Sequence, residues 1–419
     1  MTEASSMAEA PSRPVTAPPT LSHAGLRRVL VVLCVTQVVS WGVLYYAFPV
    51  LATTISADTG WSPGTVMAAF SISLITSALT GIPVGRWLDR WGPRPVMTGG
   101  SLLAIPAVIG IATARSPLVF FLAWIAAGAA MAAVLYQPAF AALTVWWGPR
   151  RLVALTTLTL IAGFASTIFA PLTAALVERL DWRTTYLVLA AALAAITVPA
   201  HWFGLRGRWP RAASATSGME AGSAPDSTSV SRADNQRTAS AVARSRPFIL
   251  LTLASCLGAF AIYAVVINQV PLLIERGLST STAALALGLG GAGQVCGRLG
   301  YHRLAAHTSV RARTMVILGA GAATSAPLGL VPGPAALLIA AAVLAGAARG
   351  LFTLLQATAI SDRWGIHHYG SLNGLFTAPA LVASAIAPWA GTALAEVFGG
   401  YPVVFVLLAG LAGVATLLA

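Results

Sequence analysis

The chain has 419 residues, of which 57% are hydrophobic and only 9% are charged, and its mean hydropathy is +0.80. A soluble fold of this length needs far more polar surface, so the composition indicates a membrane protein. All 25 basic residues are arginine, which excludes a P-loop lysine and Schiff-base chemistry. Because these arginines are spread between apolar segments, the net charge of +13 predicts no nucleic-acid partner.

The first 28 residues are rich in Pro, Ser and Ala and predict a disordered cytoplasmic tail. They lack the apolar core of a signal peptide. Cys34, Cys256 and Cys296 all lie inside apolar runs, where a free cysteine behaves as a small hydrophobic residue. Their spacing fits neither a disulfide framework nor a zinc site, so we expect no metal and no cofactor.

Twelve segments are long and apolar enough to cross the hydrocarbon core, which takes about 20 residues. They cover residues 29–52, 63–85, 95–113, 117–142, 152–177, 184–204, 247–271, 281–302, 314–331, 335–360, 370–395 and 401–419. A polar Ser/Ala/Arg stretch at 205–246 cannot bury itself and predicts a cytoplasmic linker. The expected fold is therefore an all-α membrane protein with twelve transmembrane helices in two six-helix halves, 29–204 and 247–419.

The distribution of arginines predicts the orientation. If the N-terminus is cytoplasmic, the outer loops receive only Arg115, Arg179, Arg183 and Arg276, and the other loop and linker arginines face the cytoplasm. Positive charge concentrates on the cytoplasmic side of membrane proteins. We therefore expect both termini in the cytoplasm and a monomeric, multi-pass protein of the cell membrane.

The two halves repeat each other at a single offset of 217 residues. The matched pairs are Ser62 and Ser279, Arg94 and Arg311, Pro117 and Pro334, Trp147 and Trp364, Gly148 and Gly365, and Pro171 and Pro388. Two parallel six-span repeats related by an axis along the membrane normal are a transporter design, in which the substrate lies between the halves near the midplane.

A loop with regular spacing follows the second predicted span. The stretch GIPVGRWLDRWGPRPV contains Gly85, Asp89, Arg90, Gly92 and Arg94. Together with the twelve spans and the linker, it resembles the signature loop of the major facilitator superfamily. Glycine permits a tight turn and close helix approach, and Asp89 can interact with a helix N-terminus or an arginine to lock one face shut. The resemblance implies that these five residues form a conformational gate.

Two arginines lie inside predicted spans, where a charge costs about 2.5–3.5 kcal/mol even on the mild insertion scale. Arg349 is close to the predicted midplane, and Arg298 is about 25 Å into its span at 1.5 Å per residue. One explanation is that both arginines are retained in the membrane because the function of the protein requires them. The alternatives are that Arg298 snorkels to the inner headgroups and that Arg349 ties down helix-end carbonyl groups.

The segment GQVCGR, which ends at Arg298, resembles the eighth span of monocarboxylate porters and oxalate/formate antiporters. The stretches SWGVLYYAFPVL (40–51) and ERLDWRTTYLVLA (178–190) resemble the same branch. This resemblance implies that Arg298 binds a substrate carboxylate, for which the planar guanidinium is well suited. The chain departs from the branch at Gln294, where proton-coupled porters carry aspartate, and in having no lysine on the first or eleventh span.

No acidic residue lies in the middle of a predicted span, which favours an anionic substrate moved by exchange or facilitated diffusion. Arg349 is expected to supply a second positive charge. The predicted walls of the pocket are Gln37, Trp41 and Tyr45, which follow helical spacing, together with Tyr136, Gln137, Tyr263, Asn268 and Gln356. The alternative for the aromatic residues is ordinary helix packing.

These patterns predict a secondary active or facilitative transporter of small organic anions, either monocarboxylates or dicarboxylates, that works by alternating access. The alternative within transport is efflux of a xenobiotic or a secondary metabolite. A membrane sensor needs a folded output domain, and the linker is too short and too polar for one. An enzyme is not expected, because no nucleophile elbow, HExxH motif or paired carboxylate is present.

Overall fold

The computed structural model describes residues 21–209, 241–364 and 369–419, so most of the predicted tail and the middle of the linker lie outside it. The helices of the first half are α1 (His23–Trp41), the π-helical segment η1 (Gly42–Tyr46), α2 (Ala47–Thr59), α3 (Pro63–Trp91), α4 (Pro93–Thr113), α5 (Pro117–Val134), α6 (Tyr136–Trp147), the short 3₁₀ turn η2 (Gly148–Arg150), α7 (Arg151–Ala162), α8 (Ala165–Val177) and α9 (Trp182–Gly204). Those of the second half are α11 (Arg246–Glu275), α12 (Thr280–His307), α13 (Val310–Leu330), α14 (Ala335–Trp364), α15 (Tyr369–Phe398) and α16 (Tyr401–Leu418).

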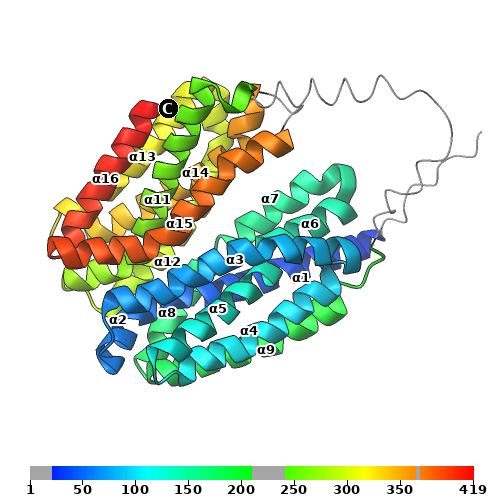
Figure 1. Ribbon diagram of the computed structural model, residues 1–419, viewed down its shortest axis with the longest axis horizontal. Helices are drawn as coiled ribbons and strands as arrows, with labels where there is room; N and C mark the ends of the chain where they lie inside the picture. Colours follow the sequence, from blue (N-terminus) through cyan, green and yellow to red (C-terminus); the bar gives the residue numbers. More distant parts are fainter. Residues whose placement is uncertain (1–20, 210–240, 365–368) are drawn as a thin grey trace, which may run out of the picture.

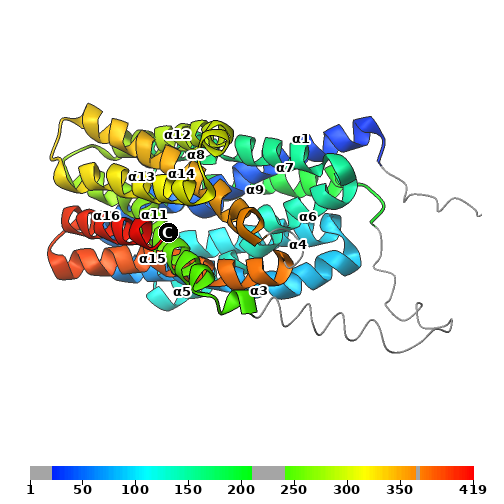
Figure 2. The same cartoon turned by 90° about the horizontal axis from the view of Figure 1, so that it is seen from above.

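The helices form two groups that follow the two halves of the sequence, blue to green and green to red in Figure 1, and Figure 2 shows the same division at right angles. Within the described residues, ten helical stretches have the length and hydropathy of membrane spans. Three of these stretches join α1 to α2, α5 to α6 and α7 to α8. The glycine-rich α12 and the 21-residue α13 are two further long helices that do not reach that hydropathy, although twelve spans were predicted.

The predicted repeat occupies matched places in the structure. Ser62 caps α3 by accepting the N–H of Thr65 at 3.2 Å, and Ser279 caps α12 by accepting the N–H of Thr282 at the same distance. A serine at this position satisfies a free amide of the first helical turn. Gly365, the partner of Gly148, lies outside the described residues. The other matched residues lie early in α4 and α13, at the start of α5 and just before the start of α14, at the ends of α6 and α14, and inside α8 and α15. Residues that are paired by the sequence repeat therefore occupy corresponding positions relative to the helices of the two halves.

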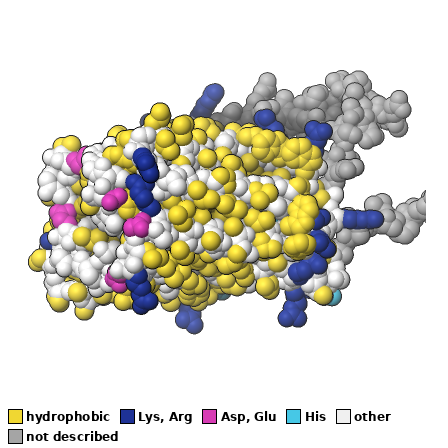
Figure 3. Space-filling view, turned by 90° about the horizontal axis from the view of Figure 1, so that it is seen from below, with side chains coloured by type: hydrophobic (Ala, Val, Ile, Leu, Met, Phe, Trp, Pro, Cys, Tyr) yellow, Lys and Arg dark blue, Asp and Glu magenta, His cyan; other side chains and the backbone are white. Residues whose placement is uncertain are grey.

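The outer surface is that of a protein surrounded by lipid. Large apolar side chains such as Leu79, Leu122 and Leu344 are more than half exposed. On the face in Figure 3, a broad apolar band separates the arginines at one end from a mixture of acidic side chains and arginines near the other. We call these the arginine-rich end, where α3 ends and α4 begins, and the acidic end, which carries Asp58, Glu178, Asp181, Glu275 and Glu396.

Three spans of the first half are interrupted. The first contains the π-helical segment Gly42–Tyr46, the fourth breaks at Leu135, and the fifth breaks at Gly163 and Phe164. Gly42 is required at its position, because a Cβ there would lie 2.2 Å from the ring of Phe169. Irregular backbone at membrane depth is tolerated where it is buried in protein or lines a cavity. The interruptions therefore mark the interior where a cavity is expected.

The two halves contact each other through α2 with α11, α3 with α15, and α8 with α12. Near the acidic end, the main-chain N–H of Trp389 donates to Ser71 Oγ at 3.0 Å. The hydroxyl of Thr167 donates to the carbonyl of Gly288 at 2.8 Å. A Cβ on Gly291 would lie 2.1 Å from Ser166 Oγ, so this approach depends on glycine. These contacts close the space between the halves at the acidic end.

Candidate functional site

Close packing of α12 against α14 positions both membrane-embedded arginines. A Cβ on Gly297 would lie 2.1 Å from the carbonyl oxygen of Ala347, and a Cβ on Gly350 would lie 2.1 Å from that of Gln294. Real side chains do not fit at such distances, so the two backbones approach this closely only because both residues are glycine. Arg298 follows Gly297 and Arg349 precedes Gly350. The helix contact thus places the two guanidinium-bearing residues side by side in the second half.

Arg298 is only 8% exposed, so it does not snorkel to a headgroup layer. Its Nη1 donates across the half interface to the main-chain carbonyl of Thr159, in the last turn of α7. The carboxyl end of a helix carries partial negative charge, which stabilises a nearby cation. The Nε of the same guanidinium is buried and has no hydrogen-bond partner in the described part of the chain. Arg298 therefore keeps donor capacity for a ligand.

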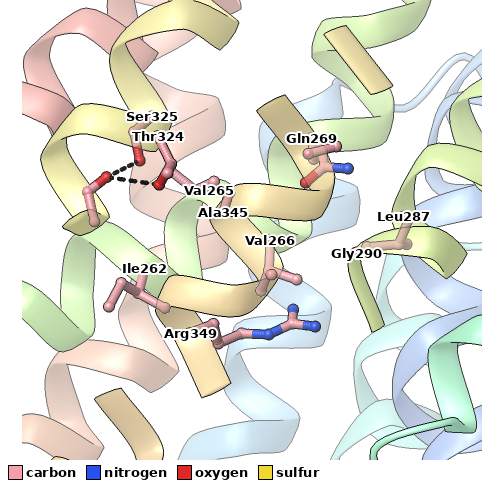
Figure 4. Close-up of a pocket in the computed structure, with 13 residues that line it drawn as sticks. Ile262, Val265, Val266, Gln269, Leu287, Gly290, Thr324, Ser325, Ala345 and Arg349 are labelled. Atoms are coloured by element: carbon pink, nitrogen blue, oxygen red, sulfur yellow. Dashed lines mark hydrogen bonds between the residues drawn. The ribbon is translucent and has the colours of Figure 1, made fainter. Parts of the chain in front are cut away.

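Arg349 is 6% exposed and lies in the middle of α14. Its Nη2 donates to Gln294 Oε1 at 3.0 Å, and its Nε is likewise buried without a partner among the described residues. Its bond is to a side-chain amide, so it does not tie down a helix-end carbonyl. Figure 4 shows its side chain at the edge of a small pocket of about 20 Å³ within the second half. That pocket is little larger than a water molecule needs, so it offers no room for an organic ligand.

A second cavity, of about 140 Å³, is lined by both Arg298 and Arg349. We call it the cationic lobe. Its lining comes from both halves: Trp41, Tyr45, Tyr46, Tyr136, Ala162, Gly163, Tyr263, Val266, Gln294, Arg298, Arg349 and Thr353. Neither arginine forms an ion pair within residues 21–209, 241–364 and 369–419. The cationic lobe thus carries two positive charges that no described carboxylate neutralises.

An aromatic cluster forms the wall of this lobe. The ring of Trp41 lies 5.2 Å from that of Tyr45 and 5.0 Å from that of Tyr136, and Tyr45 lies 5.1 Å from Tyr46. Tyr263 of α11 adds an aromatic side chain from the second half. Each of the three interruptions contributes to this wall: Tyr45 and Tyr46 from η1, Tyr136 next to the break at Leu135, and Gly163 from the break in the fifth span.

Four of these aromatic residues, Trp41, Tyr45, Tyr136 and Tyr263, also line a second and larger space of about 310 Å³. We call it the apolar lobe. Its remaining lining residues are Leu74, Ser77, Ala78, Met131, Ala132, Leu135, Gln137, Leu381, Ser384 and Ala385. The site between the halves therefore consists of a cationic lobe and an apolar lobe with a shared aromatic boundary.

Three residues predicted to wall the pocket lie outside both lobes. Gln37 is fully buried, donates from Nε2 to the carbonyl of Val134 at 2.6 Å, and accepts the indole N–H of Trp41 at 3.2 Å. Asn268 is also fully buried and bonds the carbonyls of Ala264 and Pro388. Gln356 is partly buried on α14 and lines neither lobe. Gln37 and Asn268 thus donate to main-chain carbonyl groups of neighbouring helices. They hold the helices of the cavity wall together without lining the cavity themselves.

The predicted gate residues lie at the arginine-rich end, and the hydrogen bond and ring contacts of Arg90 and Arg94 in the described chain stay within the first half. Gly92 ends α3 with a φ of +80°, and a Cβ there would lie 2.8 Å from the ring of Trp209, so the turn requires glycine. Arg94 donates to the carbonyl of Trp202 at 2.8 Å and lies over its ring. Asp89 is exposed and forms no ion pair with any described residue. The predicted lock is therefore not engaged in this conformation, whose closed contacts are at the opposite end.

The remaining gate residues, Arg90 and Gly85, also indicate that the lock is not engaged. Arg90 extends over the neighbouring Trp91 ring at 5.8 Å, within the first half. A Cβ on Gly85 would meet no described atom within 4 Å, so no helix packs against it here. The expected close approach at Gly85 is therefore absent among the described residues in this conformation.

Sequence reasoning missed six residues that line the cationic lobe: Tyr46, Ala162, Gly163, Val266, Gln294 and Thr353. The sequence singled out Gln294 only because proton-coupled monocarboxylate porters carry an aspartate at the matching position. Thr353 stands four residues after Arg349, on the same helical face, so helical spacing from the arginine was a usable signal. Tyr46 reaches the lobe because the π-helical segment adds a residue to the turn, and no local sequence pattern gives that shift.

Two pseudo-symmetric helical halves with a polar cavity between them define a membrane transporter and not an enzyme. The family model described as the Major Facilitator Superfamily matches residues 33–337, and the chain belongs to this superfamily.

Curated relatives match parts of the chain. It is 31% identical to mouse (Mus musculus) monocarboxylate transporter 11 over 142 residues, which are 33% of this chain and 30% of that protein. It is 27% identical to the fujikurins efflux protein of Gibberella fujikuroi over 135 residues, or 32% of this chain and 28% of that protein. The matched regions thus span less than a third of either relative.

Solved structures share the fold over almost the whole chain. A bacterial homologue of the human lysosomal transporter Spinster, in an inward-facing and unoccupied conformation, superposes with a TM-score of 0.73 at 15% identity, over 95% of this chain and 96% of that chain. The nucleoside transporter NupG (D323A mutant) gives a TM-score of 0.73 at 14% identity, over 94% and 98%. At such identities the likeness concerns the fold alone.

Proposed function

We propose that the protein is a secondary active or facilitative transporter of small organic anions that works by alternating access. One observation carries the proposal: Arg298 and Arg349 both line one cavity between the halves, and no described carboxylate pairs with either of them. An unpaired charge is costly to bury, so an anionic ligand that neutralises it gains affinity. Two guanidinium forks also match the geometry of a carboxylate.

The chemistry of transport follows from these contacts. A carboxylate entering the cationic lobe competes with the carbonyl of Thr159 for Arg298 and with the amide of Gln294 for Arg349. The bond from Arg298 to Thr159 joins the two halves, so its replacement by a substrate bond changes the interface between them. Rocking of the halves then closes the arginine-rich end and opens the acidic end. Asp89 and the neighbouring arginines serve as the lock of the arginine-rich end in that second conformation.

The cellular setting belongs to the same proposal. The arginine-rich end faces the cytoplasm, because positive charge favours that side. Both termini are then cytoplasmic, and the transporter acts as a monomer in the cell membrane. The partial match to a monocarboxylate transporter supports an assignment to that branch.

The test is counterflow into proteoliposomes with a panel of carboxylates, comparing the wild type with Arg298→Ala and Arg349→Ala. Both variants are expected to fold and to lose transport. Arg276→Ala is the matched control, because Arg276 also donates to a main-chain carbonyl, that of Gly329, but lines neither lobe. Retained transport in both cavity variants would remove the anion site from the proposal.

Efflux of a larger xenobiotic or secondary metabolite is the second candidate. The apolar lobe favours it, as do the names of two partial relatives, the fujikurins efflux protein and a multidrug resistance protein from Aeromonas hydrophila that is 29% identical over 101 residues. Net export of neutral compounds by the Arg298→Ala variant would favour this function over anion transport.

A further inference from the structure

The two lobes differ in charge as well as in size. Arg298 and Arg349 both belong to the cationic lobe, and no arginine, aspartate, glutamate or histidine is among the described residues that line the apolar lobe. A second ionised group on a ligand in the apolar lobe would therefore be desolvated without a partner, which is strongly unfavourable. A ligand that spans both lobes carries its charge at one end only.

The volumes indicate the size of the uncharged end. The cationic lobe, at about 140 Å³, has room for a carboxylate and a few more atoms. The apolar lobe, at about 310 Å³, is by itself as large as pockets for drug-sized ligands, which measure about 300–1,000 Å³. An acid of two to four carbon atoms would fill only the first lobe and would gain nothing from burial in the second.

The chemistry of the shared boundary fits a flat or bulky apolar body. Trp41, Tyr45, Tyr136 and Tyr263 line both lobes, so a ligand that extends from one lobe to the other must pass their rings. The indole N–H of Trp41 is already donated to Gln37, which leaves the ring itself as its contact surface. Aromatic rings bind apolar and aromatic groups through offset or edge-to-face contacts.

Few polar groups reach the body of such a ligand. Apart from the tyrosine hydroxyl groups of the shared boundary, Ser77, Gln137 and Ser384 supply two hydroxyl groups and one amide on the wall of the apolar lobe, whose other side chains are aliphatic or aromatic. They allow an occasional hydroxyl, ether or carbonyl oxygen on the ligand, but they cannot balance a charge.

We propose that the substrate is a bulky amphipathic monocarboxylate. Its single carboxylate lies between Arg298 and Arg349, and its uncharged aromatic or aliphatic body occupies the apolar lobe beyond the aromatic boundary. This inference rests on the proposed function and narrows its substrate class: it excludes, as preferred substrates, the shortest monocarboxylates and any dicarboxylate whose second carboxylate would lie in the apolar lobe.

Ligand binding to the purified protein tests this without the passive membrane leak of apolar acids. The dissociation constants of acetate, benzoate, 2-naphthoate, 2,6-naphthalenedicarboxylate and methyl 2-naphthoate are measured by titration calorimetry. We expect 2-naphthoate to bind at least tenfold more tightly than acetate, and both the dicarboxylate and the uncharged ester to bind at least tenfold more weakly than 2-naphthoate.

Variants separate the two lobes. Ala78→Phe fills the apolar lobe and is expected to weaken 2-naphthoate binding at least tenfold while acetate binding stays unchanged. Leu79→Phe is the matched control, because Leu79 is the next residue of α3, is 65% exposed and lines neither lobe. Ser384→Leu fills the same lobe from α15 and replaces Ala78→Phe if that variant does not fold.

The outcomes distinguish this inference from the proposed function. If acetate or the dicarboxylate binds as tightly as 2-naphthoate while Arg298→Ala abolishes binding of every acid, the bulky monocarboxylate is wrong and the anion site stands. If Ala78→Phe and Ser384→Leu both bind 2-naphthoate as tightly as the wild type, the bulky monocarboxylate is likewise wrong and the anion site stands. If Arg298→Ala and Arg349→Ala bind all acids like the wild type, the proposed function itself fails.

Discussion

The carboxylate of Glu396, near the end of α15, accepts a hydrogen bond of 2.8 Å at Oε1 from the main-chain N–H of Gly64 in the first turn of α3. The bond joins the two halves at the acidic end and places a negative charge at a helix N-terminus, where the helix dipole stabilises it. A Cβ on Gly64 would lie 3.0 Å from Oε2, so the approach favours glycine. This bond must break whenever the halves separate at this end.

Removing that carboxylate is expected to favour opening at the acidic end. Glu396→Ala loses a charge-assisted bond at an exposed position, worth about 1 kcal/mol, so the open population should rise about fivefold. The measurement is the rate at which an impermeant maleimide, added on the side of the acidic end, labels an Ala385→Cys variant without the three native cysteines. Glu396→Gln keeps an acceptor oxygen and should change the rate less. An unchanged rate in Glu396→Ala means that the bond does not hold the halves together.

The contact of α12 with α14 leaves no room for an extra methyl group. Gly350→Ala places a Cβ 2.1 Å from the carbonyl oxygen of Gln294 and is expected to destabilise the protein by about 1–3 kcal/mol through overpacking. Gly300→Ala is the control on α12, where a Cβ meets no described atom within 4 Å. Thermal unfolding in detergent should show a lower Tm for Gly350→Ala alone. Equal shifts would mean that the close contact is not required.

The ion pair between Arg313 and Asp362 connects α13 to α14 at the arginine-rich end, and the Arg313 side chain is only 8% exposed. Asp362→Asn leaves that guanidinium without its counter-charge. Because Asp362 is 29% exposed, we expect a loss of about 2 kcal/mol, below the 3–5 kcal/mol typical of a fully buried pair. Chemical unfolding measures the loss. Asp89→Asn, which removes an exposed carboxylate without an ion pair in the described chain, should cost under about 0.5 kcal/mol.

Transport is expected to be independent of a proton gradient. Arginine stays protonated at physiological pH, and no aspartate, glutamate or histidine is among the described residues that line the two lobes. Counterflow should therefore persist when a protonophore removes the gradient, and its rate should vary less than about twofold between pH 6 and 8. If uptake of every substrate needs an inward proton gradient, the exchange or facilitated mechanism is wrong.

The fold was largely predictable, because an apolar run of about 20 residues is a local property of the sequence. The two buried arginines were predictable for a related reason: a charge inside such a run is costly enough to need an explanation. The break at Leu135 has a local cause, because Pro138 has no N–H to donate to the carbonyl of Val134. The interruptions at Gly42–Tyr46 and Gly163 were not predictable, because they depend on tertiary contacts such as the packing of Gly42 against Phe169. Their position decides which aromatic side chains reach the cavity.

The amide side chains show the same limit. Gln37 and Asn268 look like pocket residues in sequence, since a polar amide inside a span needs a partner. In the structure their partners are main-chain carbonyls of other helices, Val134 for Gln37 and Pro388 for Asn268. Val134 directly precedes the break at Leu135, and its carbonyl has no main-chain partner along the helix because Pro138, four residues on, has no N–H to donate. A proline in the sequence shows which carbonyl is left free, but not which distant side chain then bonds to it.

The interruptions of the first half have no counterpart in the matching helices of the second half, α11, α14 and α15, each of which runs continuously for 30 residues. The pseudo-symmetric halves are therefore mechanically unequal. The helices of the first half are interrupted at the depth of the two arginines. The second half carries both guanidinium groups on continuous helices, α12 and α14, which pack closely against each other through glycine. During reorientation the second half is then expected to move as a rigid unit while the first half bends at its interrupted helices. The two ends of the pathway therefore need not open by symmetric motions.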